Sequence, residues 1–225
     1  MVTVYPSDRA IAGLVLAHGA GAGQQSRFMI ETGQALATRG ITTATFDFPY
    51  VTAGRSVPDK APVLEAAWRE AIEETRRHPA FSALPLFIGG KSMGGRIASH
   101  IAAQGVEGIR GLVFLGYPLH PPGRPEQRRD KHLPDITEPM LFVQGSRDQF
   151  GGADEIRALL PRLNTGAEVF EVADGDHSFK VRVKIVSRKQ QAVIDEIYDV
   201  VAAFILRGLK VQSPDGSRDP DAGGA

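Results

Sequence analysis

The segment from Leu86 to Arg96 reads Leu-Phe-Ile-Gly-Gly-Lys-Ser-Met-Gly-Gly-Arg and carries the strongest structural information in this chain. A short apolar run ends in glycines, exposes one serine and continues into a segment compatible with a helix. Gly90, Ser92 and Gly94 match the Gly-x-Ser-x-Gly pattern of a strand that turns sharply into a helix and presents a nucleophilic serine. The small flanking residues let the backbone make that turn without a side-chain clash.

This pattern is not decisive alone, because glycine accounts for 25 of the 225 residues. An ordinary strand-to-helix turn with a surface serine would look the same. The length favours one domain with a large core. We expect that domain over residues 1–211, followed by a disordered tail over residues 212–225 that is rich in Gly, Pro, Ser and Asp.

Bulk composition excludes several classes of function. The formal net charge of +0 gives no global field to gather nucleic acid or anionic lipid. We therefore expect a small-molecule substrate, with neither nucleic acid nor membrane as a partner. The absence of cysteine excludes disulfides, thiolate metal sites and a cysteine nucleophile. The start of the chain lacks a basic segment followed by a long apolar run, so we expect a cytoplasmic protein.

Short apolar runs alternate with longer amphipathic ones, which is typical of a parallel sheet flanked by helices. The expected strands are 12–17, 41–48, 86–89, 109–115, 140–143 and 167–172. The expected helices are 26–39, 63–78, 93–104, 153–163 and 188–209. Loops are expected over 49–62, 117–138 and 173–187, with a possible short strand at 181–185. The prediction is an α/β fold, a three-layer αβα sandwich around a mostly parallel sheet.

Ligands of parallel sheets bind at the carboxyl ends of the strands, so residues that directly follow strands are the first candidates. Four chemically capable side chains do so: His18, Ser92, Asp148 and His177. A serine hydroxyl needs a base to take its proton, and histidine is the usual choice. His177 lies in a turn-rich loop after a strand, where a base would sit. Asp148 could orient that base.

Other residues compete for these roles. Asp47, after the second strand, is the main rival for the acid, and a turn or capping role is the ordinary explanation for Asp148 itself. Asp174 and Asp176 would have to fold back onto their own loop. The remaining histidines are weaker candidates for the base: His78 and His100 belong to predicted helices, and His120 and His132 lie in a proline-rich segment.

Acyl transfer also needs hydrogen-bond donors for the developing oxyanion. The backbone N–H of Met93 follows the serine and opens a helix. A second N–H could come from Ala20 or Gly21, in the loop that begins with His18 and Gly19. A glycine-rich loop could instead cradle a phosphate, but this one matches neither the dinucleotide-binding nor the P-loop pattern.

The order nucleophile, acid, histidine, each after a successive strand, resembles the α/β-hydrolase superfamily. The motifs that carry the resemblance are 18–21, 90–95, 145–148 and 175–179, and it extends over about residues 12–209. Within the superfamily the chain is similar to small dienelactone-hydrolase-like proteins. The resemblance implies Ser92 as nucleophile, Asp148 as acid and His177 as base, with Met93 and Ala20 as oxyanion donors and no metal or organic cofactor.

The sequence also departs from that family. The usual two N-terminal strands are missing or reduced to residues 2–5, so we expect six or seven strands in a minimal fold. Dienelactone hydrolases use a cysteine nucleophile, which this chain lacks. The predicted function is therefore a serine esterase for a small or medium acyl ester. The alternative is a hydrolase fold that serves as a non-catalytic binding or scaffold module.

Basic residues also gather near the predicted site. Arg124, Arg128, Arg129 and Lys131 lie in the loop over 117–138, and Lys91 precedes the serine. These cations could select anionic substrates. The interpretation that we favour is a solvated loop and a lysine that points away from the pocket. The sequence predicts neither the substrate nor the oligomeric state.

Overall fold

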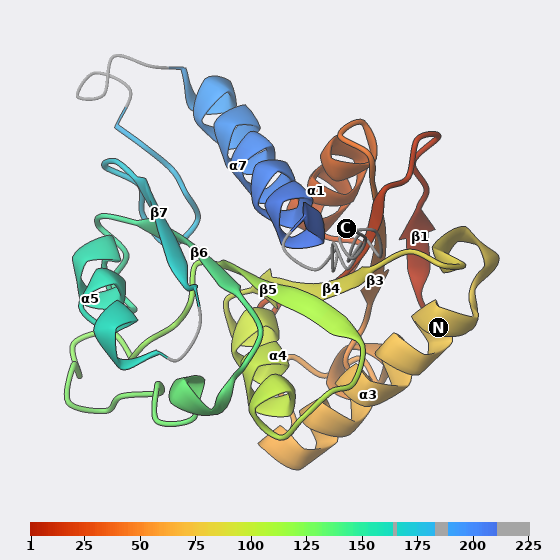
Figure 1. Cartoon of the computed structure of the whole chain (residues 1–225). Helices are drawn as coiled ribbons and strands as arrows, with labels where there is room; N and C mark the ends of the chain where they lie inside the picture. The colour runs from red at the N-terminus through yellow and green to blue at the C-terminus, as the bar shows by residue number, and fades with distance from the viewer. Residues whose placement is uncertain (164–165, 183–188, 211–225) are drawn as a thin grey trace, which may run out of the picture.

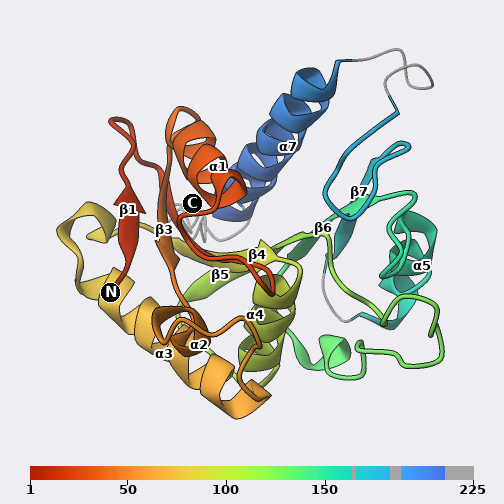
Figure 2. The same cartoon turned by 180° about the vertical axis from the view of Figure 1, so that it is seen from behind.

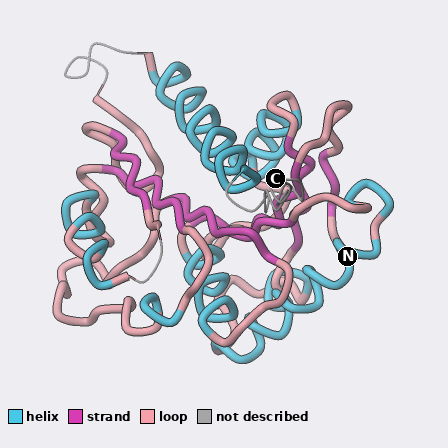
Figure 3. Tube along the Cα trace, viewed as in Figure 1, coloured by secondary structure: helices cyan, strands magenta, loops and turns pink. Residues whose placement is uncertain are grey.

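The computed structural model describes residues 1–163, 166–182 and 189–210. Its centre is one seven-stranded sheet with strand order β1-β3-β2-β4-β5-β6-β7 (Figures 1 and 3). The strands are β1 Thr3–Tyr5, β2 Ala12–Ala17, β3 Ile41–Phe46, β4 Leu86–Lys91, β5 Ile109–Leu115, β6 Met140–Gly145 and β7 Glu168–Val172. Only β1 runs antiparallel to its neighbour. The predicted α/β class and the mostly parallel sheet are confirmed.

Helices cover both faces of the sheet (Figures 1 and 2). One face carries α1 (Arg27–Ala37) and α7 (Gln190–Lys210). The other carries α3 (Ala61–Arg77), α4 (Met93–Ala103) and the short α5 (Ala153–Arg157). Each face has its own apolar cluster, one around Trp68, Ile97 and Phe114, the other around Met29 and Ile205. Because β2 and β3 are buried on both faces, they consist of uninterrupted buried residues, as parallel interior strands do.

The strand order determines where a site can form. The chain passes from β2 to β3 on one side of β2, then returns to place β4 on the other side of β2. This reversal opens a crevice at the carboxyl ends of β2 and β4, where loops leave in opposite directions. Ala17 pairs with Gly90 at those ends. The residues that follow, His18 and Ser92, are thereby brought to the same rim.

Two predicted segments were wrong. Residues 49–62 were expected to be a loop, but Pro49–Thr52 forms a short helix, α2, because a proline at the first turn presets a helical φ. The helix expected over 153–163 ends at Arg157, and a 3-10 turn, Leu160–Arg162, follows. Pro161 explains the break, since its ring would clash with the carbonyl of Arg157 in a continued helix.

The remaining elements lie close to their predicted ranges. The N-terminal strand is indeed reduced, to β1. Most of the possible strand at 181–185, and the tail expected over 212–225, lie outside the described residues. Within the described ranges, no helix is long and apolar enough to cross a membrane.

Candidate active site

Ser92 lies on a strained turn between β4 and α4. Its φ of 50° and ψ of −115° lie in a region that residues with a side chain rarely adopt. Its N–H donates to the Leu115 carbonyl at 3.1 Å, which anchors the turn to β5. A Cβ on Gly94 would lie 2.4 Å from the Ala17 carbonyl oxygen, so only glycine lets α4 start this close to β2. The strain and the close packing hold the hydroxyl clear of its neighbours.

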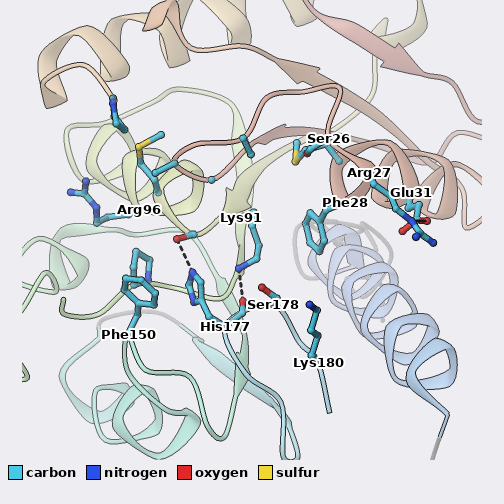
Figure 4. Close-up of a pocket in the computed structure, with 18 of the residues that line it drawn as sticks. Ser26, Arg27, Phe28, Glu31, Lys91, Arg96, Phe150, His177, Ser178 and Lys180 are labelled. Atoms are coloured by element: carbon cyan, nitrogen blue, oxygen red, sulfur yellow. Dashed lines mark hydrogen bonds and ion pairs between the residues drawn. The ribbon is translucent and has the colours of Figure 1, made fainter. Parts of the chain in front are cut away.

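His177 bridges Ser92 and Asp148. Its Nε2 lies 2.9 Å from Ser92 Oγ, a contact that Figure 4 marks with a dashed line. Its Nδ1 lies 2.7 Å from Asp148 Oδ2. The Asp148 carboxylate is buried and also accepts from the Gln144 amide at 3.0 Å and from the Phe150 N–H at 2.8 Å. A carboxylate on Nδ1 holds the proton there, which leaves Nε2 free to accept the serine proton. These three side chains, 85 positions apart at their extremes, form one hydrogen-bonded chain.

Close backbone packing brings the acid and base loops together. A Cβ on Gly145 would lie 2.4 Å from the Gly175 carbonyl oxygen, so a larger residue at the end of β6 would push the loops apart. The Arg147 N–H donates to that same Gly175 carbonyl at 2.9 Å. Both glycines belong to the motifs singled out in the sequence. Their role is to allow this contact, which lets Asp148 reach His177.

The loop after β2 lies beside the nucleophile. A Cβ on Gly19 would be 3.5 Å from Ser92 Cβ, and both Gly19 and Ala20 line the pocket in front of the serine. His18 is fully buried; its Nδ1 lies 2.8 Å from the Gly19 carbonyl, and its Nε2 accepts from the Phe48 N–H at 3.3 Å. Burial lowers the pKa of His18, so the ring is a neutral brace for the loop. Gly21 forms the turn itself, with φ 71°, and is not among the residues that line the pocket.

Lys91 does not point away from the pocket, and that interpretation of the sequence was wrong. Its Nζ donates to the His177 carbonyl at 2.6 Å and lies 5.2 Å from the centre of the Phe179 ring, and its side chain lines the pocket (Figure 4). The absence of a side chain at Gly116 leaves room for the ammonium, since a Cβ there would lie 2.9 Å from Nζ. Burial lowers the pKa of Lys91 to about 8.

The hydrogen-bonded chain opens into a pocket of about 930 Å³. Its walls come from α1, from the start of α3 and the residues before it, from the start of α4, from the first turns of α7, and from the loops after β2, β5, β6 and β7. Phe150 lies against the His177 ring, with centroids 4.3 Å apart. Figure 4 shows Arg96 and Phe150 on one side of His177, and Phe28 and Arg27 on the other. The pocket is thus long enough to extend on both sides of the serine.

The rival acids have other partners. Asp47 accepts from the Gln24 N–H at 2.7 Å and lies 3.7 Å from His18 Nε2. Asp174 pairs with Arg147 and Arg182 on the outside of the base loop, and Arg182 holds the pKa of the Asp174 carboxyl well below its usual range. Asp176 accepts from the N–H groups of Ser178 and Lys180 at 2.8 and 2.9 Å. Within the part of the chain that the structure describes, the carboxylate that His177 contacts is that of Asp148.

The other histidines lie apart from Ser92. His100 and His132 contact one another on the outer side of α4, with ring centroids 4.5 Å apart. His120 contacts Glu155 at 3.2 Å, and His78 accepts from the Ala80 N–H at the end of α3. Among the residues that the structure describes, no group of three or more His, Asp or Glu side chains could hold a metal ion.

Sequence reasoning missed three residues of the site. Arg96 lines the pocket one helical turn after Ser92, the Phe150 ring lies tilted against His177, and Gln144 holds the loop that carries Asp148. The four-residue spacing of Arg96 from Ser92 was a usable signal, because such residues share a helix face. No signal in the sequence pointed to Gln144. Its side-chain amide donates hydrogen bonds to Asp148, Tyr117 and Gly151, and these groups come together only in the fold.

The fold and the Ser-His-Asp geometry define the class of α/β hydrolases. The family described as alpha/beta hydrolase domain matches residues 10–206, which is most of the chain. The chain therefore belongs to this family, and the resemblance inferred from the sequence is confirmed.

Solved structures with the same fold include several hydrolases. A dienelactone hydrolase from Anabaena variabilis superposes with a TM-score of 0.70 at 18% identity, over 92% of this chain and 90% of that one. Est1E from Butyrivibrio proteoclasticus, in a structure with bound ferulic acid, gives 0.69 at 13% identity, over 93% and 95%. TT1662 from Thermus thermophilus gives 0.67 at 20% identity, over 93% of each. At these identities the likeness establishes the fold.

Proposed function

We propose that this protein is a serine hydrolase that cleaves carboxylic esters through an acyl-enzyme. The observation that carries the proposal is the hydrogen-bonded chain from Ser92 Oγ through His177 to Asp148, with distances of 2.9 and 2.7 Å. Ser92 and His177 line a large pocket, and the serine lies on a strained turn. A structural serine needs neither the strain nor an oriented base. The dienelactone hydrolase and esterase neighbours support ester hydrolysis as the chemistry.

In the proposed reaction, Ser92 Oγ attacks the carbonyl carbon of the ester while its proton passes to His177 Nε2. The Asp148 carboxylate stabilises the imidazolium that forms. The backbone N–H groups of Met93 and Ala20 receive the oxyanion; that of Met93 is one of the first in α4, which have no acceptor within the helix.

Collapse of the tetrahedral intermediate breaks the bond to the alcohol oxygen, which takes the proton from His177. Water then attacks the acyl-enzyme and gives its proton to His177, and the second intermediate releases the carboxylic acid and restores the Ser92 hydroxyl. The steps need only the described side chains, the ester and water. The cytoplasm stays our predicted compartment, since a chain without cysteine fits a reducing environment.

A fluorophosphonate probe tests the proposal directly, because it reacts with activated serines. We expect the wild type to be labelled at Ser92, located by mass spectrometry, and Ser92→Ala to be unlabelled. Ser82→Ala is the matched control, since Ser82 is exposed beyond α3 and its loss should leave labelling intact. Release of nitrophenol from 4-nitrophenyl acetate should be lost in Ser92→Ala and His177→Ala.

If the protein is instead a non-catalytic binding module, the labelling and the nitrophenol assay should both give the opposite result. Folded wild-type protein would then stay unlabelled and would release nitrophenol no faster than the Ser92→Ala variant. That result would overturn the proposed esterase function, whatever the fold.

A further inference from the structure

Two arginines meet at one end of the pocket. Arg96, on α4, and Arg129, in the loop between β5 and β6, both line it. Both side chains are half-buried. Burial lowers the pKa of Arg96, and the like charge of Arg129 lowers it further. The repulsion between the two charges is unfavourable unless something else in the pocket compensates it.

Hydrogen bonds hold the backbone of both arginines in place, and the Arg96 guanidinium has a partner of its own. The Arg96 N–H donates to the Ser92 carbonyl at 3.0 Å, one helical turn beyond the nucleophile, and its guanidinium donates to His100 Nε2 at 3.3 Å. The Arg129 N–H donates to the Leu119 carbonyl at 2.8 Å, and its carbonyl accepts from the buried Tyr117 hydroxyl at 2.8 Å. The pair is part of a fixed wall and not of a loose surface loop.

The carboxylates near Arg96 and Arg129 form ion pairs with other residues. Glu65 pairs with His100 at 3.0 Å, Asp130 with Arg128 at 3.0 Å and Arg162 at 3.5 Å, and Glu155 with His120 at 3.2 Å. Within residues 1–163, 166–182 and 189–210, neither Arg96 nor Arg129 forms an ion pair with a carboxylate. Two further acids line the pocket and are also paired, Glu31 on α1 with Arg27 and Asp59, just before α3, with Arg55.

We infer that Arg96 and Arg129 form a subsite for an oxyacid group, a carboxylate or a phosphate, carried by the ester substrate. Guanidinium forks bind such groups with two parallel hydrogen bonds, and partial burial strengthens the bonds. An anion between the two would also relieve their mutual repulsion. The inference rests on the proposed ester hydrolysis for the reacting bond, and it adds the class of substrate.

The position of the wall favours recognition during the reaction. Arg96 follows Ser92 by one turn of α4 and lines the same pocket, on the side of His177 away from Phe28 (Figure 4). A charged group bound there would fix the orientation of the ester in the pocket. Lys91, on the far side of His177 from Arg96, donates to the His177 carbonyl and belongs to the base loop, not to this wall.

The first test compares kcat/KM for 4-nitrophenyl esters whose acyl chains have matched length and end in a methyl group, a carboxylate or a phosphate. A second set carries the same end groups on the alcohol. We expect one anionic ester to exceed its neutral match by about tenfold to hundredfold, the effect of one or two charge-assisted hydrogen bonds. The better of the two end groups identifies the oxyacid.

Variants then assign the preference to the wall. Arg129→Gln and Arg96→Gln should each lower the ratio of anionic to neutral kcat/KM by about tenfold or more. Arg124→Gln is the matched control: it removes the same charge from the same loop, where Arg124 is exposed and does not line the pocket, and should keep the wild-type ratio. Ratios separate a lost subsite from a general loss of activity.

A binding measurement separates this inference from the proposed function. Inorganic phosphate, compared with sodium chloride at equal ionic strength, should raise the Tm of wild type and Arg124→Gln but not that of Arg129→Gln. That shift without any ester turnover would keep the subsite and reject the esterase. Turnover with no preference for any anionic ester, or a preference that Arg129→Gln leaves intact, would reject the subsite and keep the esterase.

Discussion

His177 is positioned by four groups, which come from two segments of the chain, residues 91–92 and 148–150. Asp148 holds Nδ1, Ser92 lies at Nε2, the Phe150 ring lies tilted against the imidazole, and Lys91 donates to the backbone carbonyl. The base sits in a loop, so its precision depends on these contacts and not on a rigid helix or strand. Changes to the groups around His177 should therefore alter rate more than they alter folding.

Asp148→Asn tests the acid. The amide keeps the shape of the carboxylate but lacks its charge, so it neither stabilises the imidazolium nor fixes the proton on Nδ1. We expect kcat for 4-nitrophenyl acetate to fall by about 10³- to 10⁴-fold. Circular dichroism should show the native fold, because Asn still accepts from the Phe150 N–H.

Asp47→Asn is the comparison that decides between the two aspartates. Asp47 contacts Gln24 and lies near His18, so its loss should cost less than about tenfold in kcat. A larger loss for Asp47→Asn than for Asp148→Asn would refute the assignment of the acid.

Lys91→Met tests a positioning role. Methionine fills the space of the lysine stem but donates no hydrogen bond to the His177 carbonyl. Loss of one such bond predicts a threefold to tenfold fall in kcat with little change in KM. Steady-state kinetics on a neutral ester measures both constants.

Lys91→Arg supplies the control, since it keeps a donor and a charge at the same position. It should recover most of kcat if the donor is what matters. A Lys91→Met variant with a raised KM and an unchanged kcat would instead place Lys91 in substrate binding.

At the scale of elements, the pattern of apolar residues, together with the Gly and Pro residues that interrupt it, predicted the central strands and the long helices well. The run Ile109–Leu115 is strand β5 as expected, because a buried parallel strand is mostly apolar, here with the exposed Arg110 as the one charged residue, and Gly116 follows it. Pro49 and Pro161 are visible in the sequence. Whether a proline begins a short helix, as in α2, or prevents one from continuing, as after α5, depends on how the neighbouring residues fold.

The site residues that follow the ends of strands were predictable from the sequence. Ser92, Asp148 and His177 each follow a strand, and the parallel sheet brings them to one rim. The side chains that enter the pocket from helices and long loops were not predictable, because their direction depends on packing. Lys91 shows this best: the space beside Gly116 turns it inward, and that space exists only once β4 and β5 are paired.

The segment between β5 and β6 packs on α4 through a neutral histidine, which makes stability depend on pH. His132 Nε2 lies 2.7 Å from Ser99 Oγ, and burial, with His100 and Arg96 nearby, lowers the pKa of His132 to about 4. Between pH 6.5 and 4 the unfolded chain therefore binds a proton that the folded chain does not. Stability should fall as the pH falls through this window, by up to about 3 kcal/mol from this residue.

Urea unfolding of wild type and His132→Gln from pH 8 to 4 measures this contribution. The difference between their free energies of unfolding should be constant from pH 8 to 7, since His132 is then neutral in both states. Below pH 6.5 it should shift against the wild type. A difference that does not change with pH would show that His132 is protonated alike in both states.

The whole molecule places side chains of different character at the two ends of one pocket. At one end Arg96 and Arg129 come from the face of α4. At the other, on the opposite face of the sheet, Phe28 of α1 and Ile194 of α7 form an apolar part of the wall, next to the ion pair of Arg27 with Glu31. Ser92 stands between them because the strand order reverses between β2 and β4. The sheet edge thus joins two environments that neither helical layer provides alone, and each should govern a different part of the ester.

Ile194→Trp tests the apolar end. The larger ring should occupy space that a long acyl chain needs and that an acetyl group does not reach, so the ratio of kcat/KM for octanoyl to acetyl 4-nitrophenyl esters should fall about tenfold or more. Ile194→Val, which adds no bulk, should change that ratio by less than about threefold. If Ile194→Trp lowered both esters equally, the acyl chain would not extend toward α7, and the cationic end would have to receive it. An uncharged octanoyl chain gains nothing from two guanidinium groups. That outcome would therefore also predict that the wild type prefers long neutral esters only weakly, and the same series of esters measures this preference.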